Sequence, residues 1–365
     1  MRILVINAGS SSLKWQYFDG ERLILDENIQ RWNPQEGFDD LVEAVTAAGG
    51  VDAVGHRVVH GGPRLRSATL IDDSVIAYLK TTIDLAPLHQ PPAIAGIEAA
   101  RRAFPQAAQV ACFDTAFHDT LTAAAYTYAL PKEWNERWGL RRYGFHGLSH
   151  AYAFRAGAHL ADVPADSARI LTAHLGAGAS LCAVLAGRSV DTTMGFTPLE
   201  GLAMVTRSGS VDPGLMLWLL ENTDIDVTQL SNAMEHASGL AGLSGTSGDI
   251  RDVAAAMDEG DSAAELAWQV FNHRLASLAG QMITSMGGLD LVVFTGGIGE
   301  HQPGVRTELA RSLSFLGVEL DDESNRAAQG DALISATSSR VPVVVVTARE
   351  DVQIVREVLG VVSAA

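Results

Sequence analysis

The chain has 365 residues, of which 47% are hydrophobic and 19% are charged, a composition typical of ordinary globular proteins. This length exceeds what one compact core usually serves, so two domains are expected. The formal net charge of −17 argues against binding to nucleic acid or to anionic membranes, and any anion site has to be locally basic.

The first twenty residues predict a strand, a turn of small residues and a second strand. An apolar run gives way to Asn7, Gly9 and three serines before apolar character returns. Gly9 permits close approach of a ligand, and Ser10, Ser12 and Lys14 offer donors to an anion. Taken alone, the pattern favours an edge hairpin with a polar turn.

The same pattern returns at residues 169–180, which align with residues 2–13 without a gap. The alignment places Asn7 on His174, Gly9 on Gly176 and Gly20 on Gly187, which indicates a duplicated domain. A third Gly-rich loop, with Gly296, Gly297 and Gly299, follows the apolar strand 291–294. Three such loops at strand ends fit a nucleotide held in a cleft between two related lobes.

Strands and helices alternate through the rest of the chain. Strands are predicted at 51–59, 109–113 and 341–346, and helices at 38–48, 74–83, 93–104, 148–160, 213–221, 263–286, 303–313 and 351–359. In the helix 263–286 the spacing of five apolar residues predicts a stripe facing the core, made of Leu266, Val270, Leu275, Leu278 and Met282.

Features outside the motifs bear on the cellular compartment. Cys112 and Cys182 lie in apolar strand-like runs, which predicts buried free thiols. The apolar run after Met1 is too short for a signal peptide, and no apolar stretch is long enough to span a bilayer. We therefore expect a cytoplasmic protein.

Several polar residues follow predicted strands or sit among glycines. Arg57, in the segment 55–62, is suited to clamp a carboxylate or phosphate, although a surface salt bridge is the common alternative. Asp114 follows a strand and could hold Mg²⁺ or act as a helix N-cap. His146 follows two arginines in the segment 141–147, and Arg207 ends a long Gly-punctuated loop.

Together these segments resemble acetate kinase and its propionate and butyrate kinase relatives. The matching segments are 7–14, 55–62, 113–118, 142–147, 194–207 and 295–300, in the family's order from end to end. Between about residues 20 and 50 the chain is shorter than is usual in that family.

The resemblance implies an α/β fold of two duplicated ribonuclease-H-like domains with a central cleft, the actin-like fold of sugar kinases. One lobe would comprise residues 1–115 with 351–365 returning to it, and residues 116–350 would carry the nucleotide and dimer surfaces of a homodimer. The implied reaction is reversible: ATP and acetate give ADP and acetyl phosphate by direct in-line transfer with Mg²⁺.

Site roles follow only from this resemblance. Catalytic roles fall on Asn7, Arg57, Asp114, His146 and Arg207, with His146 and Arg207 at the transition state and Asn7 and Glu350 near the metal. The acyl pocket would comprise Val59, Leu88, Phe145 and Pro198. Nucleotide or phosphate contacts would come from Ser10, Ser12, Lys14, His174, Gly176, Ala177, Gly178, Asp249, Arg251, Gly296, Gly297, Ile298 and Gly299.

The chain departs from the family pattern at a few positions. Ala177, Gln90, His301 and Arg349 stand where asparagine is usual, and Ala177 and His301 lie on the nucleotide side. The changes at Ala177 and His301 predict a weakened or altered preference for the phosphoryl donor. Alternative functions are a propionate or butyrate kinase, use of GTP or pyrophosphate as donor, an actin-like ATPase, or a nucleotide-binding pseudoenzyme.

Overall fold

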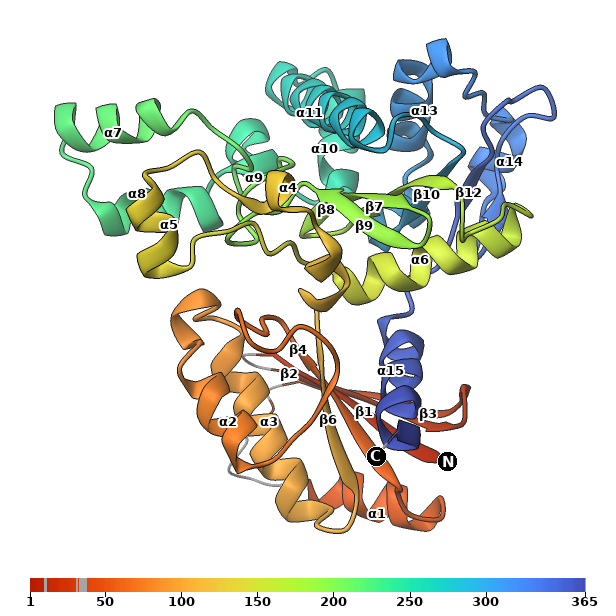
Figure 1. The fold of residues 1–365 in the computed structure, drawn as a ribbon. Coiled ribbons are helices and arrows are strands. Elements are labelled where there is room, and N and C mark those ends of the chain that lie inside the picture. The colour runs from red at the N-terminus through yellow and green to blue at the C-terminus, as the bar shows by residue number, and fades with distance from the viewer. Residues whose placement is uncertain (10–11, 31, 33–37, 365) are drawn as a thin grey trace. The chain divides into compact units, whose positions relative to one another are not determined.

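The computed structural model describes residues 1–9, 12–30, 32 and 38–364, and it divides into two compact units (Figure 1). The first unit comprises Met1–Asp119, Phe145–Tyr152 and Arg349–Ala365, and the second comprises Thr120–Gly144 and Ala153–Ala348. The predicted boundary after residue 115, and the assignment of nucleotide and dimer surfaces to the second lobe, stay predictions.

Each unit is built on a mixed sheet of six strands. In the first unit the strands are β1 (Arg2–Ala8), β2 (Ser12–Asp19), β3 (Arg22–Gln30), β4 (Ala53–Val58), β5 (Thr69–Leu70) and β6 (Ala108–Phe113). In the second they are β7 (Arg169–Leu175), β8 (Ala179–Leu185), β9 (Arg188–Thr192), β10 (Leu291–Thr295), β11 (Ala332–Leu333) and β12 (Val343–Val345).

The two sheets have the same topology. The first has the order β3-β2-β1-β4-β6-β5 and the second the order β9-β8-β7-β10-β12-β11, read from its other edge. In both, a meander of three antiparallel strands joins a parallel pair, and a short antiparallel strand closes the far edge. The predicted duplication is therefore confirmed.

The repeat is not free of gaps, however. In the first hairpin Ala8 pairs with Leu13, whereas in the second Leu175 pairs with Ala179, so the second turn is one residue shorter. Beyond the turn Gly20 corresponds to Ala186, because each donates its N–H to the residue before the first strand, at 3.0 Å. The gapless alignment of Gly20 with Gly187 was wrong, since small residues in both turns hid the deletion.

Helices cover the sheets and fill the connections. Those between the strands of the first unit are α1 (Asp39–Ala47), α2 (Asp73–Lys80) and α3 (Gln90–Ala103), with the 3-10 turn η1 (Ile83–Leu85), and a second 3-10 turn, η2 (Ala116–Thr120), follows β6. In the second unit they are α4 (Ala123–Tyr126), α5 (Lys132–Trp138), α7 (Pro213–Asn222), α8 (Val227–His236), α9 (Gly239–Ser244), α10 (Ile250–Asp258), α11 (Ser262–Met286), α12 (Gly296–His301), α13 (Pro303–Ser312), η3 (Ser314–Leu316) and α14 (Asp322–Ala327).

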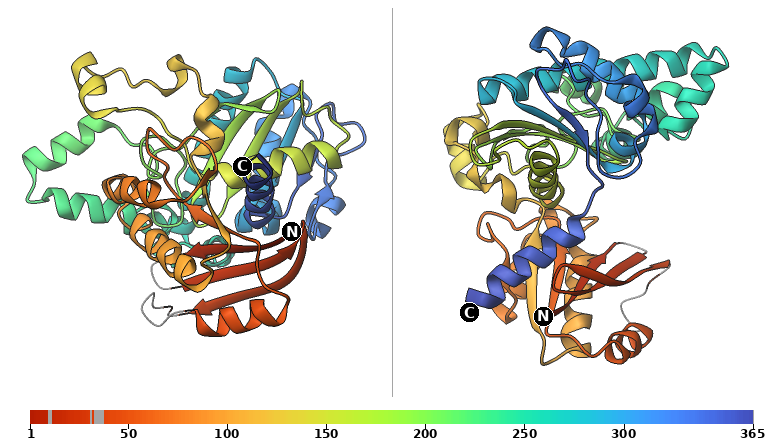
Figure 2. Two further views of the ribbon diagram at one scale, coloured as in Figure 1. Left: turned by 60° about the horizontal axis from the view of Figure 1, so that its bottom comes forward. Right: turned by 90° about the vertical axis from the view of Figure 1, so that its right-hand side faces the viewer.

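Two further helices, α6 (Gly147–Leu160) and α15 (Glu350–Ala364), follow the last strand of each sheet in chain order, and α6 is divided between the units after Tyr152. Helix α6 follows β6 and packs Gly157 against Val293 of β10. Helix α15 follows β12 and packs on β1, β4 and β6, as Figure 2 shows. The C-terminal helix therefore belongs to the first unit.

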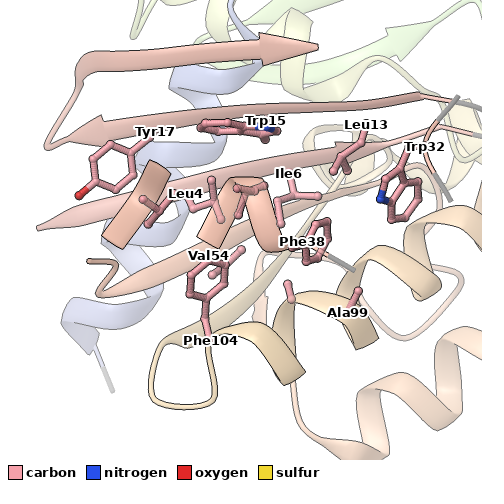
Figure 3. Close-up of a cluster of buried hydrophobic side chains, with 13 residues drawn as sticks. Leu4, Ile6, Leu13, Trp15, Tyr17, Trp32, Phe38, Val54, Ala99 and Phe104 are labelled. Carbon is pink, nitrogen blue, oxygen red and sulfur yellow. The ribbon is translucent and has the colours of Figure 1, made fainter. Parts of the chain in front are cut away.

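Alternation along β1 supplies both cores of the first unit. Leu4 and Ile6 face a cluster that includes Trp15, Phe38 and Phe104 and is covered by α1 and α3 (Figure 3). Ile3 and Val5 face the opposite cluster, which α15 completes with side chains such as Ile354 and Val358. Because both faces are covered, the strand is apolar at nearly every position.

The predicted stripe on α11 needed correction. Leu275 and Met282 are buried, but Leu266 is 52% exposed. The buried residues of α11 combine three alanines with larger apolar side chains: Ala264, Ala267, Phe271, Leu275, Ala279, Met282, Ile283 and Met286. Close packing of α11 selects alanine at three of these positions, and a count of large apolar residues misses it.

Other expectations can be compared with the coordinates directly. Cys112 and Cys182 are buried free thiols, as predicted. The strand β3 was not predicted, because its outward-facing sequence lacks a buried stripe and only Leu25 is half-buried. Within the described part of the chain, every helix is too short or too polar to traverse a lipid bilayer.

Candidate functional site

Three parallel strands of the first unit bring polar residues to one edge of its sheet. Asn7 lies near the end of β1, Arg57 near the end of β4, and Asp114 directly after β6. The Asp114 N–H donates to the carbonyl of Val58 at 3.0 Å, which continues the ladder past the strand end. Because open α/β sheets bind ligands at the carboxyl ends of their strands, this edge is the expected place for a site.

Arg57 and Asp114 form an ion pair at this edge. Nη2 of Arg57 lies 2.9 Å from Oδ2 of Asp114, and Nε lies 3.2 Å from both carboxylate oxygens. The Asp114 side chain is 2% exposed and that of Arg57 is 22% exposed. Asp114 is therefore neither an N-cap nor part of a surface salt bridge, and it fixes the guanidinium in one orientation.

The charge of Arg57 is secured by its neighbours. The negative charge of Asp114 raises the pKa of Arg57 above its ordinary value and outweighs burial, while Glu350 adds a smaller rise. Among the described residues, Nη1 of Arg57 makes no hydrogen bond to a side chain or backbone group. Arg57 is consequently a permanent cation with a donor left to bind an anion.

His146 is held in an uncommon backbone conformation next to this pair. Its φ is 56°, in the left-handed region, and the preceding Gly144 has φ 75°. The following Gly147 donates its N–H to the carbonyl of Asp114 at 2.7 Å, and a Cβ at Gly147 would collide with that carbonyl oxygen. A left-handed non-glycine residue costs about 1–3 kcal/mol and persists where surrounding structure imposes it.

The predicted acyl-pocket residues are distributed over both units. Phe145 is buried at 1% exposure, with its ring edge-on to His60 at 5.5 Å between centroids, and Val59 is half-buried one residue beyond β4. Leu88 is 55% exposed, in the segment before α3. Pro198 belongs to the second unit. That these four side chains form one pocket stays a prediction.

The two residues predicted to lie near Mg²⁺, Asn7 and Glu350, both belong to the first unit. Glu350 opens α15, and its charge acts on Arg57, while Asn7 lies at the same sheet edge. Within the described residues no three His, Cys, Asp or Glu side chains lie close enough to hold a metal together. Mg²⁺ is commonly held by one or two carboxylates plus substrate phosphates, so this donor set fits it.

A pocket of about 710 Å³ opens in the second unit. Six of the residues predicted to bind nucleotide line it: Gly176, Ala177, Asp249, Arg251, Gly297 and Ile298. Apolar walls come from Val205, Ile250 and Ile298, and His301 lies at the same pocket. Its size and its mixture of apolar walls with a few polar groups are typical of small-molecule sites.

Backbone contacts shape this pocket. The turn after β7 closes with a hydrogen bond from Gly176 N–H to the Gly178 carbonyl at 3.0 Å, and Val205 N–H donates to the Ala177 carbonyl at 3.3 Å. Gly296 has φ 80°, and a Cβ there would lie 2.8 Å from the Leu175 carbonyl oxygen. Glycine at 296 is thus required for the third motif to approach the turn.

The third motif was predicted as a loop, which was wrong. Residues 296–301 form α12, which begins directly after β10. The side chain of Glu300 accepts hydrogen bonds from the N–H groups of Gly296 and Ala348, both at 3.0 Å. The three glycines of α12 hid the helix from sequence analysis, because glycine has a low intrinsic helix propensity.

The remaining predicted residues lie apart from the pocket lining. His174, Gly178, Gly296 and Gly299 belong to the same motifs but do not line it. Arg207 is 22% exposed, with Nε 3.2 Å from a Glu235 oxygen. Ser12 and Lys14 belong to the first unit, where Lys14 Nζ is 4.0 Å from Asp26. Ser10 lies outside the described residues.

Comparison with known proteins decides the family. The sequence profile of the acetokinase family matches residues 35–356. The chain belongs to the acetokinase family.

Relatives within the acetokinase family cover the whole chain. It is 39% identical to acetate kinase from Acetivibrio thermocellus, over 99% of both proteins, and 41% identical to that from Thermoanaerobacterium thermosaccharolyticum, over 98% of both. Among solved structures it resembles the acetate kinase of Porphyromonas gingivalis (TM-score 0.90, 33% identity, 99% of both chains covered). It also resembles a propionate kinase from Francisella tularensis (TM-score 0.89, 34% identity, 99% of both).

The fold of acetokinases is thereby confirmed for this chain: two duplicated actin-like domains. Some pocket residues were nevertheless missed, namely Val205, Ser247, Ile250 and Gln302. All four lie within two positions of residues named in the sequence analysis, so the spacing of the motifs held a signal for them. Nothing in the sequence pattern singled out Tyr128 and Glu200, whose contacts with Arg142 are described below.

Proposed function

We propose that this protein is an acetate kinase, which transfers the terminal phosphoryl group of ATP to acetate and gives acetyl phosphate and ADP, reversibly. The observation that carries the proposal is a pocket of the second unit that six of the residues expected to bind nucleotide line together. Identity of about 40% to acetate kinases over the full length supports acetate as the acceptor.

The chemistry needs positioning and charge neutralisation. A carboxylate is ionised near neutral pH, so no general base is required. One carboxylate oxygen attacks the terminal phosphorus as the bond to the bridging oxygen of ADP breaks, and ADP leaves with that electron pair. Arg57, oriented by Asp114, would neutralise negative charge on the acid and the phosphoryl group, with His146 and Arg207 as further donors.

Asn7 and Glu350 would hold Mg²⁺ in this proposal. When bound, Mg²⁺ supplies positive charge to the phosphate oxygens. Asp114 orients Arg57 through three hydrogen bonds and would keep it from rotating away when the acid is absent. Glycine at position 147 lets the segment of His146 approach Asp114.

Propionate is a second candidate acceptor. One of the similar structures, 34% identical over 99% of both chains, is a propionate kinase. One methylene in an apolar pocket is worth only about 1–3 kcal/mol of discrimination, so related sites differ in acyl length by small changes.

A matrix of donors and acceptors tests the function. ATP, GTP and pyrophosphate are each combined with acetate, propionate and butyrate, and the acyl phosphate is trapped with hydroxylamine. We expect ATP and acetate to give the highest kcat/KM. Arg57→Ala should lower it by about 10³-fold, since an arginine at a transferring phosphoryl group has effects of that order. The exposed Arg311→Ala serves as control. No turnover with any pair would reject the proposal.

The protein is also proposed to be a homodimer through the α7–α8 face, defined here by Leu215, Leu217, Trp218 and Val227. These side chains are 47%, 60%, 55% and 71% exposed, and no residue of α7 is buried. A helix as apolar as α7 is unusual on a free surface, and such patches mark association sites.

A further inference from the structure

Arg142 forms an unusually complete set of contacts within the second unit. Its Nη1 donates to three successive carbonyls, those of Thr192 at 3.0 Å, Thr193 at 3.2 Å and Met194 at 3.0 Å. Its Nη2 lies 2.7 Å from Oε1 of Glu200. The guanidinium of Arg142 thus connects the end of β9 to Glu200, eight positions further along the chain. Only 14% of the Arg142 side chain is exposed.

Tyr128 binds the second carboxylate oxygen of Glu200. Its hydroxyl donates to Oε2 of Glu200 at 2.6 Å and accepts the Phe196 N–H at 2.8 Å. Burial, and beyond it the hydrogen bond to Glu200, raise the pKa of Tyr128, so the hydroxyl remains a donor. Both ends of the 196–200 loop are therefore held by one oxygen atom.

Pro198 lies at the centre of this 196–200 loop. Two longer hydrogen bonds involve Thr197 of this loop: the Leu199 N–H donates to the Thr197 hydroxyl at 3.3 Å, and the Gly195 N–H donates to the Thr197 carbonyl at 3.3 Å. A Cβ at Gly195 would collide with Oε2 of Glu200 and with the Tyr128 hydroxyl. The carboxylate is consequently packed against the backbone as well as hydrogen-bonded.

The same set of contacts includes the segment that precedes His146. The N–H groups of Tyr143 and Gly144 donate to the Gly195 carbonyl at 3.0 Å and 3.2 Å. The Tyr143 and Phe196 rings are 6.0 Å apart between centroids. Backbone hydrogen bonds thus connect Gly195, which precedes the 196–200 loop, to Tyr143 and Gly144, which precede Phe145 and His146 in the chain.

We propose that Tyr128, Arg142 and Glu200 are positioning residues that set acyl-chain selectivity by holding the 196–200 loop, and with it Pro198, in place. The inference rests on the proposed function, because it takes Pro198 as a wall of the acyl pocket. None of the three lines the nucleotide pocket. Loosening the loop should therefore change the choice of acid and leave nucleotide binding unaltered.

Tyr128→Phe is the sharpest test, since it removes one oxygen and keeps the ring. Initial rates with acetate, propionate and butyrate give kcat/KM for each acid at saturating ATP. We expect the ratio of kcat/KM for acetate over propionate to change at least threefold, with KM for ATP within twofold of wild type. Glu200→Gln, which removes the charge that faces Arg142, should shift the ratio in the same direction.

A matched control is available in the same unit. Asp290 pairs with Arg169 and is about as exposed as Glu200, at 34% against 33%, but lies away from the loop. Asp290→Asn should lower the unfolding temperature without changing the acid ratio. An unchanged ratio in folded Tyr128→Phe and Glu200→Gln, or an equal loss for all acids together with a raised KM for ATP, would overturn the proposal. Inactive wild-type protein would instead reject the proposed function itself.

Discussion

At the scale of single residues, the Arg57–Asp114 pair shows how one contact decides a role. Either residue alone had an ordinary interpretation, as a surface ion pair or a helix cap. The three hydrogen bonds between them and the burial of Asp114 exclude both interpretations and show a buried ion pair instead. A buried aspartate whose carboxylate accepts three hydrogen bonds from one arginine fixes the orientation of that arginine. The structural role of Asp114 is therefore to orient Arg57.

Ala177 lines the pocket that we propose binds the nucleotide, and the resemblance to acetate kinases implies asparagine at this position. Ala177→Asn should lower KM for ATP by about tenfold, because a hydrogen bond to a charged phosphate contributes about 1.5–3 kcal/mol. KM for acetate should stay the same and serves as the internal control. Steady-state kinetics at varied ATP measure the effect, and an unchanged or higher KM for ATP would show that the amide has no place in this pocket.

His56 makes stability depend on pH. It is 2% exposed, its Nε2 lies 2.8 Å from Oε1 of Gln109, and burial lowers its pKa to about 4. Between pH 6.5 and 4 the unfolded chain binds a proton that the folded chain refuses, so the free energy of unfolding falls as pH falls. The full loss from this residue is about 3 kcal/mol.

Urea unfolding between pH 4.5 and 7 measures this dependence. His56→Gln keeps a polar side chain beside Gln109 but cannot titrate, so its free energy of unfolding should fall less steeply by up to about 1.4 kcal/mol per pH unit. His60, whose pKa is also lowered to about 4 by burial, accounts for part of the slope that persists. Equal slopes in the variant and the wild type would contradict the assignment.

At the scale of elements, α15 completes a core and also carries a residue that we propose holds the metal. It completes one core of the first unit and begins with Glu350, the proposed metal residue. Its approach depends on Gly55 in β4, where a Cβ would lie 2.5 Å from Ile354 Cγ2 and 2.8 Å from Val358 Cγ2. Packing between this helix and the sheet therefore controls where Glu350 lies.

Gly55→Ala should lower the free energy of unfolding by about 1–3 kcal/mol through overpacking, and should lower kcat as Glu350 shifts. Gly280→Ala is the matched control, since a Cβ there meets nothing within 4 Å in α11 and should stabilise the protein by about 0.5–1 kcal/mol. Denaturant unfolding with activity assays distinguishes them. If both alanines behave alike, close packing at Gly55 is not what holds α15.

At the scale of the whole molecule, the two units repeat one topology but carry different chemistry. The first holds the Arg57–Asp114 pair, and the second holds the pocket that we propose binds the nucleotide. The second also carries the α7–α8 face, which has no counterpart among the described helices of the first unit. The two units thus share a sheet topology and differ in the segments that connect its strands.

Trp218→Asp should convert the proposed homodimer to a monomer, because it places a charge in the apolar contact. Size-exclusion chromatography with light scattering gives the mass directly. Phe315→Asp changes an aromatic side chain that is 78% exposed on η3 and should leave the dimer unchanged. A wild-type protein that is monomeric at micromolar concentration, or a dimeric Trp218→Asp variant, would refute the use of this face.

The amino-acid sequence by itself determined the duplication, the positions of most strands and helices, and the family, because these depend on local apolar patterning and on long motifs. Tertiary structure decided what local patterns cannot contain. The one-residue deletion in the second hairpin appears only in strand pairing, and α12 is a helix because Glu300 and close contact with Leu175 support it. The partnership of Tyr128, Arg142 and Glu200 joins positions up to 72 apart in the chain. Side-chain hydrogen bonds over such separations depend on where the backbone brings them, and that is a property of the folded chain alone.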